Sequence, residues 1–230
     1  MDGLYILFLV AVIFTFVVQA RVSSTFNKFA HISAGTGRTA SEVARRILDA
    51  HGLFNVRIER VRGHLTDHYD PRSQVLRLSD GVYDSASAAA VGVAAHEVGH
   101  AIQHAENYVP IVLRGKLVPV VNVASRFSWI AIMLGILISY ASVLLGSYAI
   151  AVGIILFAAT TLFHLVTLPC ELNASRRALT ELELCGWYSN AELANSEKVL
   201  RAAALTYVAA LATSLIQLLR LIRMFGNRRR

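Results

Sequence analysis

Residues 94–104 read AAHEVGHAIQH and place three histidines and one glutamate in an otherwise small and apolar run. His96, Glu97 and His100 form the pattern HExxH. Residues four apart lie on one face of an α-helix, so two imidazoles at this spacing can bind one zinc ion. The glutamate beside the first histidine can take a proton from zinc-bound water. The spacing therefore predicts the chemical groups that hydrolyse a peptide bond.

A chance match is the alternative, because glutamate is common in helices. A chance set of this kind would normally lie on a solvated helix face among other polar residues. Here the motif follows AAVGVAA and precedes AI. Charged groups in such a setting are costly unless they are paired or bind a metal. The sequence therefore favours a zinc site over a coincidence.

A catalytic zinc ion has three protein ligands and one open position, so a third ligand is needed. A third histidine six residues after His100 is excluded, because that position is Glu106 and position 103 is Gln103 rather than glycine. His104 lies one turn beyond His100 and is better placed to support a ligand than to reach the metal from the same straight helix. We therefore look to a second helix.

Glu171 is the favoured third ligand because of its position after two apolar runs. Residues 129–146 and 148–168 are each uncharged and long enough to span a bilayer, and the short join at Gly146-Ser147 predicts a transmembrane hairpin. After such a hairpin, the chain is again on the side of the membrane that carries His96. The alternative is that Glu171 is a helix N-terminal glutamate stabilised by the helix dipole. The rival ligands are Glu181, Glu183 and His164.

The composition explains why membrane helices are expected. Hydrophobic residues make up 55% of the 230 residues and charged residues only 16%, and mean hydropathy is +0.52. We expect a mainly α-helical integral membrane protein with three to four transmembrane helices and a small α+β, zincin-like catalytic region containing a β-hairpin. The two cysteines, Cys170 and Cys185, form no CxxC pattern and are expected to be unpaired thiols.

The expected divisions of the chain follow its hydropathy. They are an N-terminal transmembrane anchor (1–21), a region with the HExxH helix (22–128), a transmembrane hairpin (129–169), a polar helical segment with the third ligand (170–198), and a C-terminal apolar helix with a basic tail (199–230). The first run, residues 4–20, is read as an uncleaved anchor rather than a signal peptide, since no Lys or Arg precedes it. Residues 110–126 predict a helix that runs along or into the membrane interface, and residues 202–219 either span the membrane or lie at the interface.

The polar region before the motif predicts several short elements. Residues 41–48 suggest an amphipathic helix with Thr39 as N-cap and Glu42 completing a capping box. Residues 56–61 alternate as a strand, the turn residues 70–73 predict a hairpin, and residues 87–107 predict a helix. The strand at 75–78 could bind substrate as an added strand or be purely structural. His68, Tyr69 and Arg176 could stabilise an oxyanion or merely pack.

Four blocks carry a resemblance to a known family: HEVGHAIQH, LTDHYDPRSQVLRLS, LVPVVN and LPCELNASRRAL. Together they resemble the YugP-type membrane zinc peptidases of the neutral zinc metallopeptidase family, in the family's order and over nearly the whole chain. The resemblance implies an integral membrane zinc metallopeptidase with His96 and His100 as metal ligands, Glu97 as the catalytic glutamate, and Glu171 at the start of the downstream block. The layout also resembles the HtpX-type membrane proteases. Those proteins usually carry an aspartate four residues after the glutamate ligand, where this chain has Ser175.

The expected function is a membrane-bound zinc endopeptidase that binds one Zn²⁺ and cleaves protein or peptide substrates, membrane proteins among them. The alternative is a non-enzymatic, zinc-binding membrane scaffold or regulator. A transporter is disfavoured, because the spans hold few polar residues. Arg21 and Lys28 after the first span predict a plasma-membrane protein with a cytoplasmic catalytic region. The tail Arg228–Arg230 conflicts with that sidedness, and it is expected to meet anionic lipid rather than nucleic acid.

Overall fold

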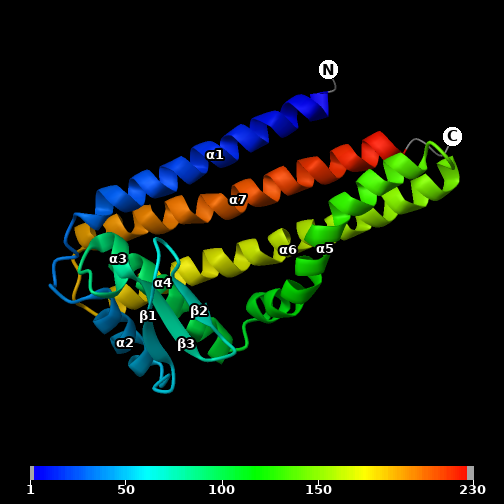
Figure 1. Ribbon diagram of the computed structural model, residues 1–230. Coiled ribbons are helices and arrows are strands. Elements are labelled where there is room, and N and C mark those ends of the chain that lie inside the picture. The colour runs from blue at the N-terminus through cyan, green and yellow to red at the C-terminus, as the bar shows by residue number, and fades with distance from the viewer. Residues whose placement is uncertain (1–2, 227–230) are drawn as a thin grey trace. The chain divides into compact units, whose positions relative to one another are not determined.

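The computed structural model describes residues 3–226 and is mostly helical, with one small three-stranded sheet (Figure 1). The predicted basic tail, Arg228–Arg230, lies outside the described residues. Two compact units account for the described chain. One comprises residues 3–17, 112–168 and 207–226, and the other residues 18–111 and 169–206. The elements are α1 (Gly3–Ala30), α2 (Ala40–Ala50), β1 (Arg57–Val61), β2 (His68–Asp70), β3 (Val75–Ser79), α3 (Asp80–Tyr83), α4 (Ala88–Ala105), α5 (Val109–Ile138), α6 (Val143–Leu184) and α7 (Asn190–Gly226).

The first unit consists of helical segments with the length and hydropathy of membrane spans. Helices α1, α5, α6 and α7 each contain an apolar window long enough to cross a bilayer. The expectation of apolar membrane helices is thereby confirmed, and the C-terminal segment is long enough to be one of them. Hydroxyl groups pair between these helices: Thr15 Oγ1 lies 3.1 Å from Thr213 Oγ1, and Thr161 Oγ1 lies 2.7 Å from Ser214 Oγ. Such pairs satisfy polar groups where lipid offers no partner.

The helical hairpin within this unit turns earlier than the sequence suggested. The predicted helix at 110–126 is confirmed, and it continues without a break to Ile138 as α5 (Val109–Ile138). The predicted turn at Gly146-Ser147 was wrong. The turn occupies residues 139–142, and Gly146 lies inside α6. A Cβ on Gly146 would come within 2.6 Å of the Gly135 carbonyl oxygen. The glycine is therefore needed for close helix approach rather than for a turn.

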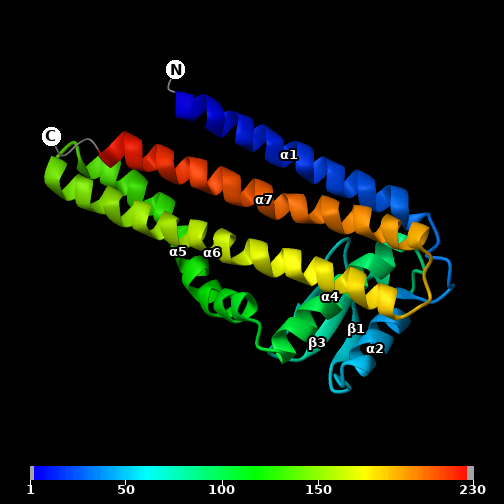
Figure 2. The ribbon, with the colours of Figure 1, turned by 180° about the vertical axis from the view of Figure 1, so that it is seen from behind.

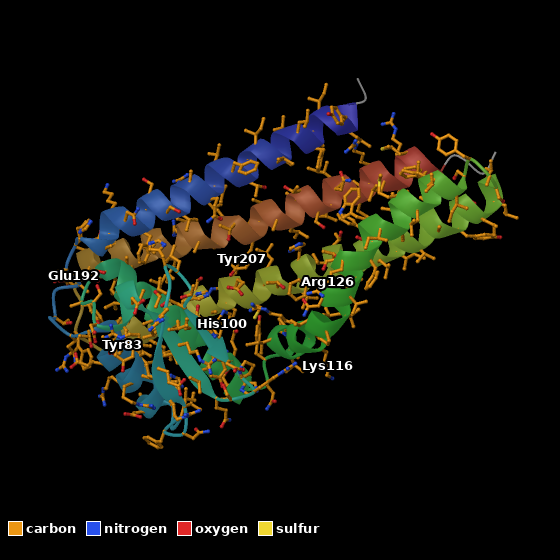
Figure 3. All side chains as sticks on the ribbon, viewed as in Figure 1. Tyr83, His100, Lys116, Arg126, Glu192 and Tyr207 are labelled. Carbon is orange, nitrogen blue, oxygen red and sulfur yellow. The ribbon has the colours of Figure 1, made fainter. Side chains whose placement is uncertain are left out.

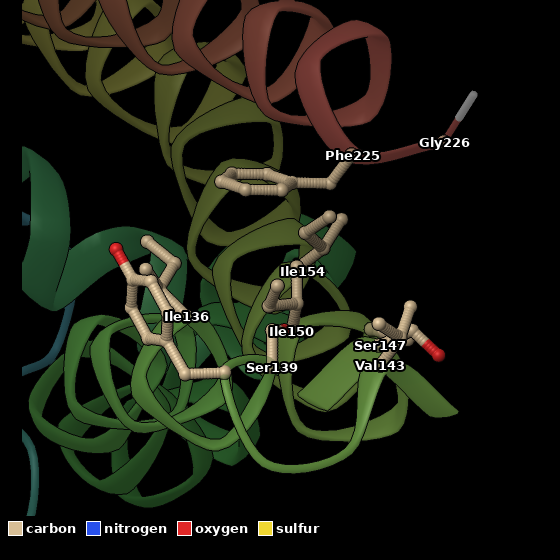
Figure 4. A pocket seen from close by; sticks show the side chains of 10 residues that line it. Ile136, Ser139, Val143, Ser147, Ile150, Ile154, Phe225 and Gly226 are labelled. Atoms are coloured by element: carbon tan, nitrogen blue, oxygen red, sulfur yellow. The ribbon is translucent and has the colours of Figure 1, made fainter. Parts of the chain in front are cut away.

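A cavity of about 520 Å³ lies beside this turn, between the ends of the α5–α6 hairpin and α7 (Figure 4). Its lining is largely apolar, with Ile136, Ile150 and Phe225 among the contributors. The described lining residues include no histidine, cysteine or carboxylate. The polar groups of this lining are the hydroxyls of Ser139, Tyr140 and Ser147.

Helix α6 continues well past Pro169, at the end of the predicted transmembrane hairpin (129–169). Proline removes one backbone hydrogen bond from a helix interior, but the next two turns are held by packing, since Cys170, Ala174 and Ala178 are completely buried. The helix ends instead at Leu184, and Gly186 follows with φ of +67°, a left-handed conformation that glycine adopts without strain. Glu171 consequently lies inside a helix.

The second unit packs helices around the small sheet. The order of strands is β1-β3-β2, with β1 parallel and β2 antiparallel to β3. The predicted hairpin is confirmed: Asp70 accepts hydrogen bonds from the Arg72 backbone N–H and the Ser73 hydroxyl. The capping box of Thr39 and Glu42 on α2 is confirmed as well. Because β3 is the central strand, it has no free edge for an added substrate strand, and of the two alternatives for residues 75–78 the structural one is correct.

Helix α4 lies at the centre of this unit and is largely buried (Figure 2). Its small residues let neighbouring backbones approach. A Cβ on Gly99 would meet the Ala174 carbonyl oxygen at 2.7 Å, and a Cβ on Gly92 would meet Ser196 Cβ at 3.2 Å. The Ser196 hydroxyl also donates to the Ala88 carbonyl at 2.9 Å. The glycines of the motif helix therefore set how closely the polar parts of α6 and α7 approach it.

Candidate metal centre

The structure brings His96, His100 and Glu171 together, and all three belong to the same compact unit. One ligand atom from each residue lies within 4.8 Å of the other two. His96 Nε2 is 3.2 Å and His100 Nε2 is 3.5 Å from Glu171 Oε2. Figure 3 labels His100 on α4, and Glu171 comes from α6. The helix spacing of HExxH and the close approach of α6 at Gly99 together produce this arrangement.

The spacing of these atoms fits a tetrahedral zinc site. Zinc bonds to nitrogen and oxygen are about 2.0–2.1 Å long, so two ligand atoms of a tetrahedron lie about 3.3–3.4 Å apart. The two histidine-to-glutamate distances, 3.2 and 3.5 Å, bracket that value. Two imidazole nitrogens and one carboxylate oxygen are also a donor set that zinc accepts in catalytic sites. The residues present therefore fit a zinc ion.

The His100 ring is held by a buried amide on its own helix. Gln103 Oε1 lies 3.0 Å from His100 Nδ1, and the Gln103 amide nitrogen donates to the Cys170 carbonyl at 2.8 Å and to Asn173 Oδ1 at 2.9 Å. With its NH₂ group used in this way, the amide presents its oxygen to the imidazole. Nδ1 of His100 then carries a proton, so Nε2 would be the nitrogen that offers its lone pair to a bound metal ion.

The His96 ring is oriented by a hydroxyl group from α6. Ser175 Oγ lies 3.1 Å from His96 Nδ1. Ser175 occupies the position at which the HtpX-type pattern has an aspartate, and here a neutral hydroxyl makes the contact with the imidazole. Each candidate histidine ligand thus has a hydrogen-bonding partner at Nδ1, the arrangement that fixes the tautomer of a metal-binding histidine.

Glu97 lies beside the candidate ligands and is held by strand β2. Its Oε2 accepts a hydrogen bond from the Tyr69 backbone N–H at 3.0 Å. Burial raises the pKa of Glu97 above its usual value, against the opposing pull of His100 and His96. A carboxylate with a raised pKa is a stronger proton acceptor than a solvated glutamate.

The electrostatics of the ligand pocket favour a cation. Burial acts to lower the pKa of His100, but hydrogen bonds with Cys170 and Glu171 and the charge of Glu97 raise it to about 10. Burial acts to raise the pKa of Glu171, yet its hydrogen bonds to His100 and His96 lower it well below the usual range. Glu171 is 1% exposed, so an ionised carboxylate there needs a compensating positive charge. Protonated His100 supplies that charge in the metal-free protein, and a bound metal cation would take its place.

The remaining predicted residues have other partners. His104 Nδ1 lies 3.1 Å from the Tyr69 hydroxyl. Glu181 lies 2.9 Å from His51, Glu183 is exposed, and His164 lies on the apolar part of α6. His68 contacts the Thr66 carbonyl, and Arg176 is exposed.

Two aspects of the site were misjudged or missed from sequence. Glu171 lies 28 residues after the start of α6, so its interpretation as a helix N-terminal glutamate was wrong. Gln103 and Asn173 were not anticipated as supporting residues. The available signal was Gln103 itself, a polar residue three positions after His100 that follows the apolar pair Ala101-Ile102.

Known protein sequences are similar to this chain over nearly its whole length. A family model described as "Putative neutral zinc metallopeptidase" matches residues 4–226. The chain is 48% identical over 215 residues to the "Putative membrane protease YugP" of Bacillus subtilis (strain 168), covering 94% of this chain and 93% of that protein. No solved structure matches. A match over almost the entire length shows that the chain belongs to this family of neutral zinc metallopeptidases.

Proposed function

We propose that this protein is a membrane-bound zinc endopeptidase whose metal is held by His96, His100 and Glu171. The observation that carries the proposal is the convergence of two imidazole nitrogens and one buried carboxylate oxygen at the spacing of a tetrahedral zinc site. Three protein ligands leave the fourth position for water or substrate, as catalytic zinc requires. The family and the relative's name support the same function.

Each residue has a defined task in peptide hydrolysis. Zinc, when bound, supplies a Lewis acid that polarises the scissile carbonyl and lowers the pKa of water. Glu97 accepts the proton of the attacking water and then transfers it to the leaving amine. The Tyr69 backbone N–H holds the Glu97 carboxylate in position for both transfers. Gln103 and Ser175 keep the histidine rings oriented, so the ligands need little rearrangement.

The setting of the site supports a zincin-like catalytic region. The HExxH helix α4 packs beside a three-stranded sheet and against the polar part of α6, which provides the glutamate. We assign this region to the cytoplasmic side of the plasma membrane. Arg21 and Lys28 follow the first apolar segment, and positive charge beside a span favours the cytoplasm.

The test separates metal binding from catalysis. Wild-type protein purified with zinc is expected to contain one ion per chain and to cleave a casein-type substrate. His96→Ala should lose the zinc. Glu97→Gln should keep it and lose cleavage by at least about 100-fold, because the amide cannot accept the proton. Cleavage by Glu97→Gln at the wild-type rate refutes the mechanism. Stoichiometric zinc without proteolysis of any substrate favours a zinc-binding scaffold instead.

A further inference from the structure

A second polar site lies on the surface of the unit that contains the metal centre, between α1 and α7. A hollow of about 440 Å³ is lined from α1 by Arg21, Thr25 and Lys28 and from α7 by Lys198 and Arg201. All of these residues belong to the second compact unit. The two helices run side by side here in both views of the ribbon (Figures 1 and 2). The peptidase mechanism uses none of these side chains.

The hollow collects positive charge that its own side chains do not neutralise. Lys28 Nζ and Lys198 Nζ each lie 5.6 Å from the centroid of the buried Phe29 ring, so one aromatic ring faces two ammonium groups. Arg201 pairs with Glu197 at 2.6 Å, but its side chain is 78% exposed and the pair is screened by water. Like charges gathered around one hollow repel, and a bound anion relieves that repulsion.

The hollow also lies at a hydropathy boundary on both helices. On α1, residues 4–20 carry no charge and Arg21 is the first basic residue after them. On α7, residues 202–219 carry no charge and Arg201 is the last basic residue before them. Where both apolar segments cross a bilayer, the boundary coincides with the phosphate level of the lipid headgroups.

We propose that this basic hollow binds the phosphate group of an anionic phospholipid. Lysine and arginine side chains donate charge-assisted hydrogen bonds to phosphate oxygens. Thr25 adds a hydroxyl donor, and the partly exposed Leu205 offers apolar surface to the glycerol and upper acyl chains. Inorganic phosphate offers the same oxygen acceptors as the lipid headgroup. The lipid is favoured because the apolar segments of both helices border the hollow.

The experiment titrates detergent-purified full-length protein with fluorescently labelled phosphatidylglycerol and measures competition by inorganic phosphate. Lys28→Gln combined with Lys198→Gln is expected to weaken lipid binding on the order of thirtyfold, given the attraction of each basic residue for anionic lipid. Inorganic phosphate should not compete at lipid-equivalent concentrations, and labelled phosphatidylcholine should bind more weakly than phosphatidylglycerol.

A control variant carries the same change in charge away from the hollow. Arg62→Gln combined with Arg72→Gln alters two exposed side chains near the sheet and should bind phosphatidylglycerol like the wild type. Equal loss in both double variants would mean that net charge, not this hollow, attracts the lipid, and would overturn the proposal. If inorganic phosphate displaced the labelled lipid as effectively as unlabelled lipid does, the hollow would be a site for a soluble phosphate compound. That result would overturn the lipid assignment. Both readouts are independent of proteolytic activity.

Discussion

Substitution of Gly99 by alanine tests how the metal centre is assembled. Gly99 lies three residues after His96 and one before His100, and its backbone faces Ala174, which lies three residues after Glu171. The contact between α4 and α6 therefore sits in the middle of the three candidate ligands. A change in this contact moves the two histidines away from the glutamate together.

The size of the displacement follows from the contact distances. A Cβ on residue 99 would lie 2.7 Å from the Ala174 carbonyl oxygen, whereas ordinary contacts begin at 3.4 Å. Relief requires the helices to separate by about 0.7 Å, because the obstacle is backbone and cannot rotate away. Zinc sites tolerate deviations of only about 0.2 Å in their bond lengths. We expect Gly99→Ala to weaken zinc binding by about 10- to 100-fold, the range found when ligand orientation is disturbed.

Stability is a less decisive measurement than zinc affinity for this variant. Overpacking costs about 1–3 kcal/mol, but alanine is favoured over glycine in a helix by about 1 kcal/mol. The two effects partly cancel in the free energy of unfolding. Zinc affinity, measured by competition with a chromophoric chelator, has no such compensation.

Two matched variants complete the test. Gly81→Ala introduces a Cβ with no neighbour within 4 Å, and Gly92→Ala places one 3.2 Å from Ser196 Cβ on α7. Neither contact involves the helix that carries Glu171, so both variants should bind zinc like the wild type. Wild-type zinc affinity in Gly99→Ala would refute the claim that this backbone contact sets the ligand positions.

Two further predictions concern the hydrogen bonds around the site and the sheet. Ser175→Ala removes the hydrogen-bonding partner of His96 Nδ1 and should raise the zinc dissociation constant about tenfold. Ser175→Thr keeps the hydroxyl and should bind zinc like the wild type in the same chelator assay. Equal zinc affinity of all three proteins would contradict the proposal that Ser175 orients His96. Hydrogen bonds from the Ser73 hydroxyl and the Arg72 backbone N–H lower the pKa of Asp70 to about 2. The charged carboxylate therefore stabilises the fold at pH values above the ordinary pKa of aspartate, and this contribution is lost as the pH falls through about 2. Asp70→Asn should therefore melt at a lower temperature than the wild type at pH 7, with the difference shrinking between pH 4 and pH 2 in thermal scans; a constant difference would show that charge is not its cause.

The sequence by itself determined the local elements and the chemistry at the centre of the site. HExxH fixes His96 and His100 on one helix face because a helix repeats every 3.6 residues, and no tertiary contact is needed for that. The capping box at Thr39 and the Asp70 turn were also predictable, since both depend on hydrogen bonds within a few residues. Long uncharged runs identified the membrane helices, because the bilayer tolerates little else.

Tertiary structure decided what depends on contacts between distant segments. Glycine was read as a turn signal at Gly146, but the close approach of Gly135 gives it a packing role that local sequence does not reveal. The central position of β3 depends on a parallel pairing with β1, to which the intervening residues gave no clue. Glu171 could be nominated from membrane topology, but only the backbone contact of Gly99 with Ala174 brings its carboxylate to within 3.5 Å of both imidazoles. These three features depend on how closely surfaces from distant parts of the chain pack together, which local sequence patterns do not specify.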